Sequence, residues 1–141
     1  MTPEKRAEVV AEARTWLRTP YHHLAKVKGA GVDCVQLIIA IYAKCGVIDD
    51  FEPEFYRPDW HLHRTEEKYL NGVKRLAKQI PVEEALPGDF ALFRFGHCAS
   101  HGAIITEWPR IVHALMGIGV IESSIHEAEV RGRLDSVWRI E

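Results

Sequence analysis

The stretch that decides the fold runs from Gly29 to Gly46 and reads GAGVDCVQLIIAIYAKCG. After Cys34 the residues are apolar almost without interruption, which is typical of a helix that is buried on all sides. Asp33 stands at the expected N-cap, where its carboxylate can accept from free N–H groups of the first turn. Gly46 follows as a C-terminal stop signal. The stretch therefore predicts a central helix from Cys34 to Cys45 with a thiol at its first position.

A cysteine at the first position of a helix is well placed for reactivity. The unpaired backbone N–H groups and the helix dipole stabilise a thiolate there, and the thiolate is the nucleophilic form. The glycines before Asp33 leave room for a substrate backbone to approach. Most free cysteines, however, are simply small buried hydrophobic residues. From its position alone, Cys34 is a candidate nucleophile, with packing as the alternative.

The rest of the chain places helices before strands. Amphipathic patterns predict one helix over residues 3–19 and another over 65–80. The segments between the predicted helices are rich in Pro and Gly or in aromatic residues, and they predict loops. After Gly88 there are short β-rich runs separated by turn residues. This order predicts an α+β fold, with helices packed on an antiparallel sheet, in a single domain over 1–141. The runs are FALFRF, GAIITEW, RIVHAL, GVIESSI and SVWRIE.

Composition and charge exclude several classes of partner. The 141 residues are 47% hydrophobic and 27% charged, and the formal net charge is -2. Lys and Arg are dispersed, so we expect no nucleic acid partner. No apolar run reaches the roughly 18 residues of a membrane span, so we expect no membrane partner. The N-terminal segment lacks the apolar core of a signal peptide, so we expect synthesis in the cytoplasm. The three cysteines lack disulfide or zinc spacings, and we expect free thiols and no cofactor.

A cysteine nucleophile needs a base, and the base needs a group that orients it. His101 stands at the start of an apolar strand pattern, and His113 stands inside the next one, where a buried imidazole needs polar partners. A turn near Trp108 and Pro109 would fold one strand back on the other and bring the two histidines within a few residues. A slip of one residue in the pairing would place the rings on opposite faces, and the sequence does not fix this register.

Two other arrangements compete with this one. Cys98 also has histidines close to it, but it stands in a predicted loop, and Cys45 lies at a helix end, where it packs. The remaining histidines offer imidazoles for a metal site, yet no clear acidic or cysteine ligand stands at the required spacing from them, so we expect no metal. His97 lies near His101, and four of the other histidines are expected at the surface or along the rim of a groove. They are His22, His23, His61 and His63.

Five motifs in order resemble the NlpC/P60 cysteine peptidases: TPY, GVDC at a helix start, LPGDFALF, SHGAII and RIVHAL. The resemblance covers residues 14–125 and implies a papain-like fold in which a helix carries the nucleophile and an antiparallel sheet carries the base. It implies hydrolysis of amide bonds in the stem peptides of bacterial peptidoglycan. More narrowly, TPYHHLAKVKGAGVDC and FYRPDW are similar to tail-associated NlpC/P60 proteins of phages and gene transfer agents. This implies phage tail proteins as further partners and delivery of the chain by a particle to the periplasm or cell wall.

The same resemblance assigns roles to individual residues. It implies that Cys34 is the nucleophile and that His101 is the general base and then the acid. His113 would be the third polar residue, which orients His101. Tyr21 and Asp33 would lie beside the sulfur and help to hold the substrate or the oxyanion.

The chain departs from the family pattern directly after the nucleophile. The family usually has a small residue and then glycine, whereas Val35 and Gln36 stand here. Their bulk would narrow the pocket, redirect specificity or mark a copy that has lost activity, but the triad residues are present and favour an active enzyme. The alternatives are a non-catalytic tail-assembly or wall-binding component with the same fold, and another papain-like amidase or acyltransferase.

Overall fold

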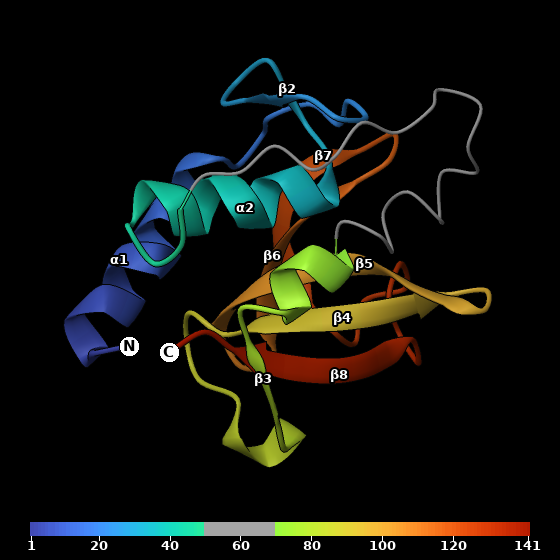
Figure 1. Ribbon diagram of the computed structural model, residues 1–141. Helices are drawn as coiled ribbons and strands as arrows, with labels where there is room; N and C mark the ends of the chain where they lie inside the picture. Colours follow the sequence, from blue (N-terminus) through green and yellow to red (C-terminus); the bar gives the residue numbers. More distant parts are fainter. Residues whose placement is uncertain (50–69) are drawn as a thin grey trace.

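The computed structural model describes residues 1–49 and 70–141, in which two helices lie on one side of an antiparallel sheet (Figure 1). These two helices are α1 (Pro3–Thr15) and α2 (Cys34–Lys44). Residues 70–74 are also helical, and a short 3-10 helix, η1, covers Val82–Glu84. The sheet has the order β3-β8-β4-β5-β6-β7. Its strands are β3 (Lys78–Ile80), β4 (Phe90–Phe95), β5 (Cys98–Glu107), β6 (Arg110–Leu115), β7 (Gly119–Ser124) and β8 (Leu134–Arg139). A separate hairpin pairs β1 (Lys26–Val27) with β2 (Gly31–Val32).

Helix α2 is the buried central helix that its sequence predicts. Its first six residues are all buried, and its apolar side chains join a core cluster with residues of α1, β4, β5 and β6. Full burial of one such side chain contributes about 1.5–3 kcal/mol. The helix approaches the sheet closely at Gly102 in β5, where an added Cβ atom would lie 2.6 Å from Cδ1 of Ile38. Glycine is therefore required at this contact for the observed spacing.

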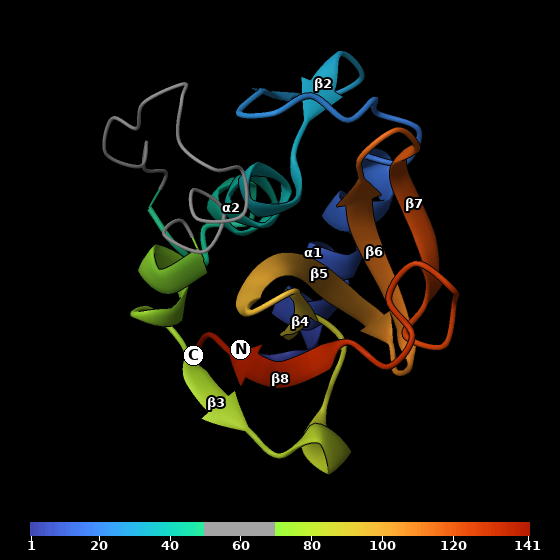
Figure 2. The ribbon, with the colours of Figure 1, turned by 90° about the vertical axis from the view of Figure 1, so that its right-hand side faces the viewer.

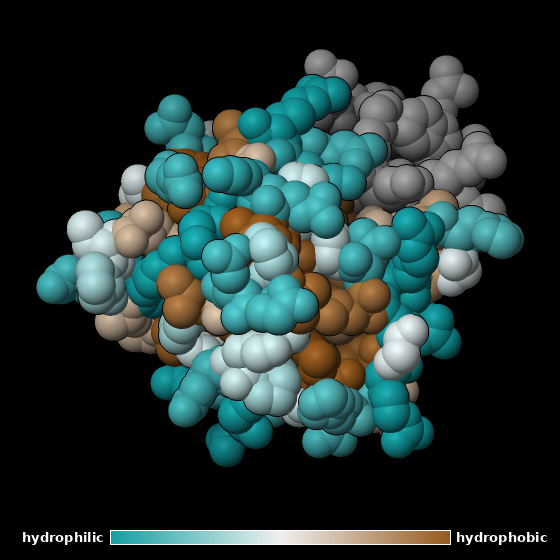
Figure 3. Space-filling view, turned by 90° about the horizontal axis from the view of Figure 1, so that it is seen from below, coloured by the Kyte–Doolittle hydropathy of each residue, from teal (hydrophilic) through white to brown (hydrophobic). Residues whose placement is uncertain are grey.

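A second apolar cluster covers the other face of the sheet. It contains Phe93 and Ile105 together with Val130, which comes from the segment between β7 and β8. Partly buried residues such as Leu134 form its edge. Figure 3, which views the molecule from below, shows a group of hydrophobic residues surrounded by hydrophilic ones. The sheet is thus packed on both faces, and this explains the nearly continuous apolar runs in β4 to β6.

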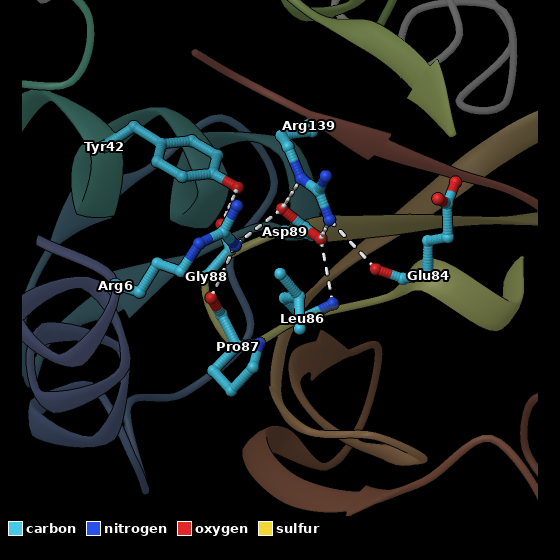
Figure 4. Close-up of polar contacts among 8 residues, drawn as sticks. All are labelled: Arg6, Tyr42, Glu84, Leu86, Pro87, Gly88, Asp89 and Arg139. Atoms are coloured by element: carbon cyan, nitrogen blue, oxygen red, sulfur yellow. Dashed lines mark hydrogen bonds and ion pairs between the residues drawn. The ribbon is translucent and has the colours of Figure 1, made fainter. Parts of the chain in front are cut away.

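A buried carboxylate joins the two ends of the chain (Figure 4). Asp89, just before β4, is 0% exposed, and its Oδ1 atom accepts from Nη1 of Arg6 at 2.9 Å and from Nε of Arg139 at 3.1 Å. Its Oδ2 atom accepts from Nη2 of Arg139 at 3.0 Å and from the backbone N–H of Leu86 at 2.9 Å. Helix α1, strand β8 and the turn before β4 are therefore tied to one point.

The α+β prediction is confirmed, but the second amphipathic helix is shorter than predicted. Residues 70–74 are helical, whereas Lys78–Ile80 form strand β3, which pairs with β8. Ile80 is buried in the second cluster, so tertiary packing overrides the helical pattern of the sequence here. Residues 50–69, which include FYRPDW, His61 and His63, lie outside the described residues. Within the described parts of the chain, no helix combines the length and the apolar character needed to cross a membrane.

Candidate active site

Cys34 is held at the first position of α2, and its side chain is 1% exposed. The thiol donates to the backbone carbonyl of Ser100 in β5, with 3.8 Å between sulfur and oxygen. Asp33 caps the helix, because its Oδ1 atom accepts from the backbone N–H groups of Val35 at 3.1 Å and Gln36 at 2.8 Å. The predicted cap and the predicted place of the thiol are both confirmed.

The second oxygen of Asp33 holds the loop that precedes the helix. Its Oδ2 atom accepts from the backbone N–H of Leu24 at 2.6 Å, and Leu24 has a φ of 69°, which is uncommon for a leucine. Burial raises the pKa of this carboxyl group, while the three N–H donors and the nearby His23 act in the opposite direction. Asp33 is 2% exposed and holds helix and loop together. Its contact with substrate stays a prediction.

Tyr21 is fixed beside the helix start by backbone pairing. It forms a parallel β-bridge with Val32, two residues before Cys34. The N–H of Val32 donates to the carbonyl of Pro20 at 3.0 Å, and the N–H of His22 donates to the carbonyl of Val32 at 3.0 Å. Because this pairing continues directly into the helix cap, the positions of Tyr21 and Cys34 depend on the same short segment.

The two histidines meet on one face of the sheet. Strands β5 and β6 pair through Ile104 and Val112, which puts His101 and His113 on the same side. Nε2 of His101 lies 2.9 Å from Nδ1 of His113. His101 is 6% exposed and His113 is 0% exposed. Next to His101 the pairing of β4 with β5 shifts in register, and such irregularities re-aim side chains. The sequence left this register open, and the structure brings the rings into contact.

Both imidazoles are held in their uncharged form. Burial, and to a smaller extent the neighbouring His113, lower the pKa of His101 from 6.5 to about 3. Burial lowers the pKa of His113 to about 4, against the opposite effect of Glu129. Two uncharged rings can share this hydrogen bond when Nε2–H of His101 donates to Nδ1 of His113. In this tautomer Nδ1 of His101 keeps a free lone pair and is able to act as a base.

Ser123 extends this series of hydrogen bonds, and the sequence did not point to it. Its hydroxyl oxygen lies 2.8 Å from Nε2 of His113, so it can accept a hydrogen bond from the N–H group of the ring at that position. Ser123 lies in β7 two residues beyond Ile121, the strand partner of His113. Its alternating place in GVIESSI was visible in the sequence, but linking it to His113 requires the register of β6 and β7.

Cys34, Tyr21 and His101 line one cavity of about 320 Å³. Figure 2 shows the β6–β7 hairpin that forms one side of it rising towards the β1–β2 hairpin. The β6–β7 hairpin is tied to the segment that precedes β1, because the N–H of Val120 donates to the carbonyl of Thr19 at 2.9 Å. The lining residues are Tyr21, Cys34, Phe95, Ser100, His101, Ala114, Leu115, Met116, Ile118 and Glu129.

The residues that follow the nucleophile do not narrow this cavity. Val35 is 1% exposed and packs in the core, and Gln36 is 2% exposed. Among the described residues that line the cavity, neither is present. Cys34 and His101 therefore face one cavity, and His113 lies behind His101 without lining it. A thiol beside an imidazole that has its own orienting partner is an arrangement suited to thioester chemistry.

The other candidates for nucleophile and ligand lie apart from this arrangement. Cys98 is the first residue of β5, not part of a loop as we expected, and is half-buried. Cys45 is the C-cap of α2, where it packs in the core as predicted. His22 and His97 are exposed. In residues 1–49 and 70–141 no group of three His, Cys, Asp or Glu side chains is arranged to hold a metal ion.

Solved structures of NlpC/P60 proteins share this fold. A Staphylococcus aureus protein, similar to lipoprotein of the NLP/P60 family, matches 99% of this chain with 42% of its own length, at 22% identity and a TM-score of 0.70. The NlpC/p60 domain of the peptidoglycan hydrolase SagA matches 95% of this chain with 97% of its own, at 21% identity and a TM-score of 0.67. RipD from Mycobacterium tuberculosis, a non-catalytic NlpC/p60 domain protein adapted to peptidoglycan binding, matches 99% of this chain at 14% identity and a TM-score of 0.64.

No protein-family model and no curated protein matches the sequence. The solved structures establish the fold, which is the papain-like α+β fold of the NlpC/P60 proteins. The chain spans less than half of the S. aureus protein but almost the whole SagA domain.

Proposed function

We propose that this chain is a cysteine hydrolase that cleaves amide bonds in peptidoglycan stem peptides through a thioester acyl-enzyme. The observation that carries the proposal is the cavity lined both by Cys34, at a helix start, and by His101, which is bonded to His113. Structural similarity to the NlpC/p60 domain of SagA, a peptidoglycan hydrolase, supports the choice of substrate.

The first half of the reaction forms the thioester. Nδ1 of His101 accepts the thiol proton of Cys34, and the sulfur attacks the carbonyl carbon of the amide. The backbone N–H of Cys34 donates to the oxygen as it becomes negative. When the C–N bond breaks, His101 returns the proton to the leaving amine. His113 accepts from Nε2–H of His101 throughout and stabilises the imidazolium while it exists.

The second half releases the acyl group. Water enters the cavity, His101 takes one of its protons, and the hydroxide oxygen attacks the thioester carbon. The C–S bond breaks, the sulfur recovers the proton from His101, and the product leaves as a carboxylic acid. An amine that replaced water in this step would make the same site an acyltransferase, which is the alternative within this chemistry.

A non-catalytic wall-binding role is the second candidate. RipD has this fold and is non-catalytic. In this chain Gln36 takes the place of a family glycine, and its Oε1 atom is buried without a hydrogen-bond partner in the described structure. An unpaired buried oxygen costs about 1–3 kcal/mol, so the site carries a substitution that packing alone does not favour.

We also propose that the protein acts in a phage tail and reaches the periplasm or cell wall with the particle. The support is the sequence similarity of TPYHHLAKVKGAGVDC and FYRPDW to tail-associated proteins. Mass spectrometry of purified particles should detect the chain together with tail proteins. Its absence from particles would remove this part of the proposal and leave the hydrolase proposal intact.

Hydrolysis is tested by incubating purified muropeptides with the protein and identifying the products by mass spectrometry. The native chain should release shortened stem peptides, and Cys34→Ala should lose at least about a thousand-fold in rate, because the nucleophile is gone. Cys98→Ala is the matched control and should keep nearly full activity, since its thiol does not line the cavity.

The outcomes separate the candidates. Intact muropeptides with the native chain, together with measurable muropeptide binding, would replace the hydrolase proposal by the wall-binding one. Activity that survives Cys34→Ala but is lost in Cys98→Ala would move the nucleophile to β5.

A further inference from the structure

The charge of the cavity is concentrated in one residue. Among the described residues that line it, Glu129 is the only carboxylate, and no Lys or Arg side chain is present. Glu129 forms no ion pair with any residue in the described ranges 1–49 and 70–141. Its carboxylate is close enough to the catalytic pair to act on His113 electrostatically. A ligand in this cavity therefore meets an uncompensated negative charge near the proposed base.

Glu129 is an exposed residue of the segment between β7 and β8, and the backbone of that segment is anchored. The next residue, Val130, is 0% exposed and packs in the second apolar cluster. The N–H of Val130 donates to the carbonyl of Glu127 at 3.1 Å, and the N–H of Arg133 donates to the carbonyl of Val130 at 3.0 Å. These bonds and the buried valine anchor the backbone on which the carboxylate is presented.

The wall beside Glu129 is apolar and open. Leu115, Met116 and Ile118 come from the β6–β7 hairpin and line the cavity. Met116 is 62% exposed and Ile118 is 57% exposed, although both are large apolar residues. Such a wall suits the methylene groups of a long side chain, whereas a carboxylate on the ligand would be repelled by Glu129. The cavity is thus complementary to an alkyl chain that ends in an ammonium group.

We propose that Glu129 binds the free side-chain ammonium group of the diamino acid in the stem peptide and selects substrates that carry it. This inference rests on the proposed function, because it assumes that stem peptides enter the cavity. Glu129 is a specificity-determining residue in this scheme, and it takes no part in proton transfer.

The test uses stem peptides with lysine as the diamino acid, in three forms: unmodified, acetylated on the lysine side chain, and acetylated on the N-terminal amine. The native chain should hydrolyse the unmodified peptide with a kcat/KM roughly ten-fold higher than for the lysine-acetylated peptide. A factor of this size corresponds to the loss of one charged hydrogen bond, here between Glu129 and the lysine ammonium group, at a site exposed to solvent. N-terminal acetylation should change kcat/KM by less than about two-fold. Glu129→Gln should reduce the ten-fold ratio to nearly one.

The matched control is Glu127→Gln, which removes an exposed acid from the same segment that does not line the cavity. It should keep the native ratio. The ratio is the readout because any effect of Glu129 on His113 changes the rates of all three peptides together. Calorimetry with Cys34→Ala gives the same comparison as dissociation constants and does not need turnover.

The outcomes distinguish the two proposals. Turnover with an unchanged ratio in Glu129→Gln, or a preference that follows the N-terminal amine, would overturn the role of Glu129 and leave the hydrolase intact. If no peptide is hydrolysed by the native chain, the hydrolase proposal fails. In that case selective binding of the free lysine amine by Cys34→Ala, lost when Glu129→Gln is added, would still support the inference, and equal binding of all peptides would overturn it.

Discussion

Acid should destabilise this protein strongly through its two buried imidazoles. In the folded state the pKa of His101 is about 3 and that of His113 is about 4, whereas an unfolded histidine has a pKa of 6.5. The unfolded chain therefore binds more protons below about pH 6.5, so the stabilising contribution is fully present above that pH and is lost as the pH falls towards the folded values.

The size of the effect follows from these values. A pH of about 5 is about 1.5 units below the pKa of an unfolded imidazole, which is then almost fully protonated. Both folded rings remain mostly neutral at this pH. At about 1.4 kcal/mol per unit, each ring costs about 2 kcal/mol. Moving from about pH 7.5 to about pH 5 should therefore lower the free energy of unfolding by about 4 kcal/mol from this pair.

Urea denaturation followed by tryptophan fluorescence measures the free energy of unfolding at the two pH values. His113→Gln should cut the acid-induced loss by about half, whatever it does to stability at neutral pH. His126→Gln is the control, because this histidine is exposed, and it should leave the loss unchanged. Asp33, whose raised pKa acts in the opposite direction, is present in all variants and cancels in the comparison.

Two results would refute this reasoning. One is a native chain whose free energy of unfolding changes by less than about 1 kcal/mol over this range, which would mean that the rings are not held neutral by burial. The other is an equal acid-induced loss in His113→Gln and the native chain, which would assign the effect to other groups.

Two further predictions concern the packing that positions the site, and both are measured as free energies of unfolding in urea. Gly102→Ala should lower the free energy of unfolding by about 1–3 kcal/mol, because the new methyl group would overlap Cδ1 of Ile38. Ile38→Val removes that atom, so the double variant should lose less than the sum of the two single losses. A loss equal to that sum would contradict the contact. Asp89→Asn should lower the free energy of unfolding by about 3–5 kcal/mol, since it leaves Arg6 and Arg139 without their shared carboxylate. The control is Arg94→Met, which removes the more exposed ion pair of Arg94 with Asp135. A loss in Asp89→Asn no larger than the loss in this control would refute the prediction.

Local interactions explain why much of the helix and its thiol could be predicted. The cap of α2 joins Asp33 to residues two and three positions later, and the apolar run that follows has no other stable place than the core. Strands β4 to β8 were recognisable for a similar reason, since β-branched and aromatic runs are bounded by turn residues. Strand β3 was not, because Ile80 fits a helical pattern and only the partner strand β8 makes it extended.

The sequence by itself determined that a thiol begins a buried helix and that two histidines lie in neighbouring strands, because both follow from contacts between residues close in the chain. Only the tertiary structure decided that His101 bonds to His113, that Ser123 supports the pair, and that Glu129 faces the same cavity. The histidine and serine contacts depend on strand register, because a shift of one residue in the pairing would send a side chain to the opposite face of the sheet. The place of Glu129 depends on the buried anchor at Val130, which is far from α2 in sequence.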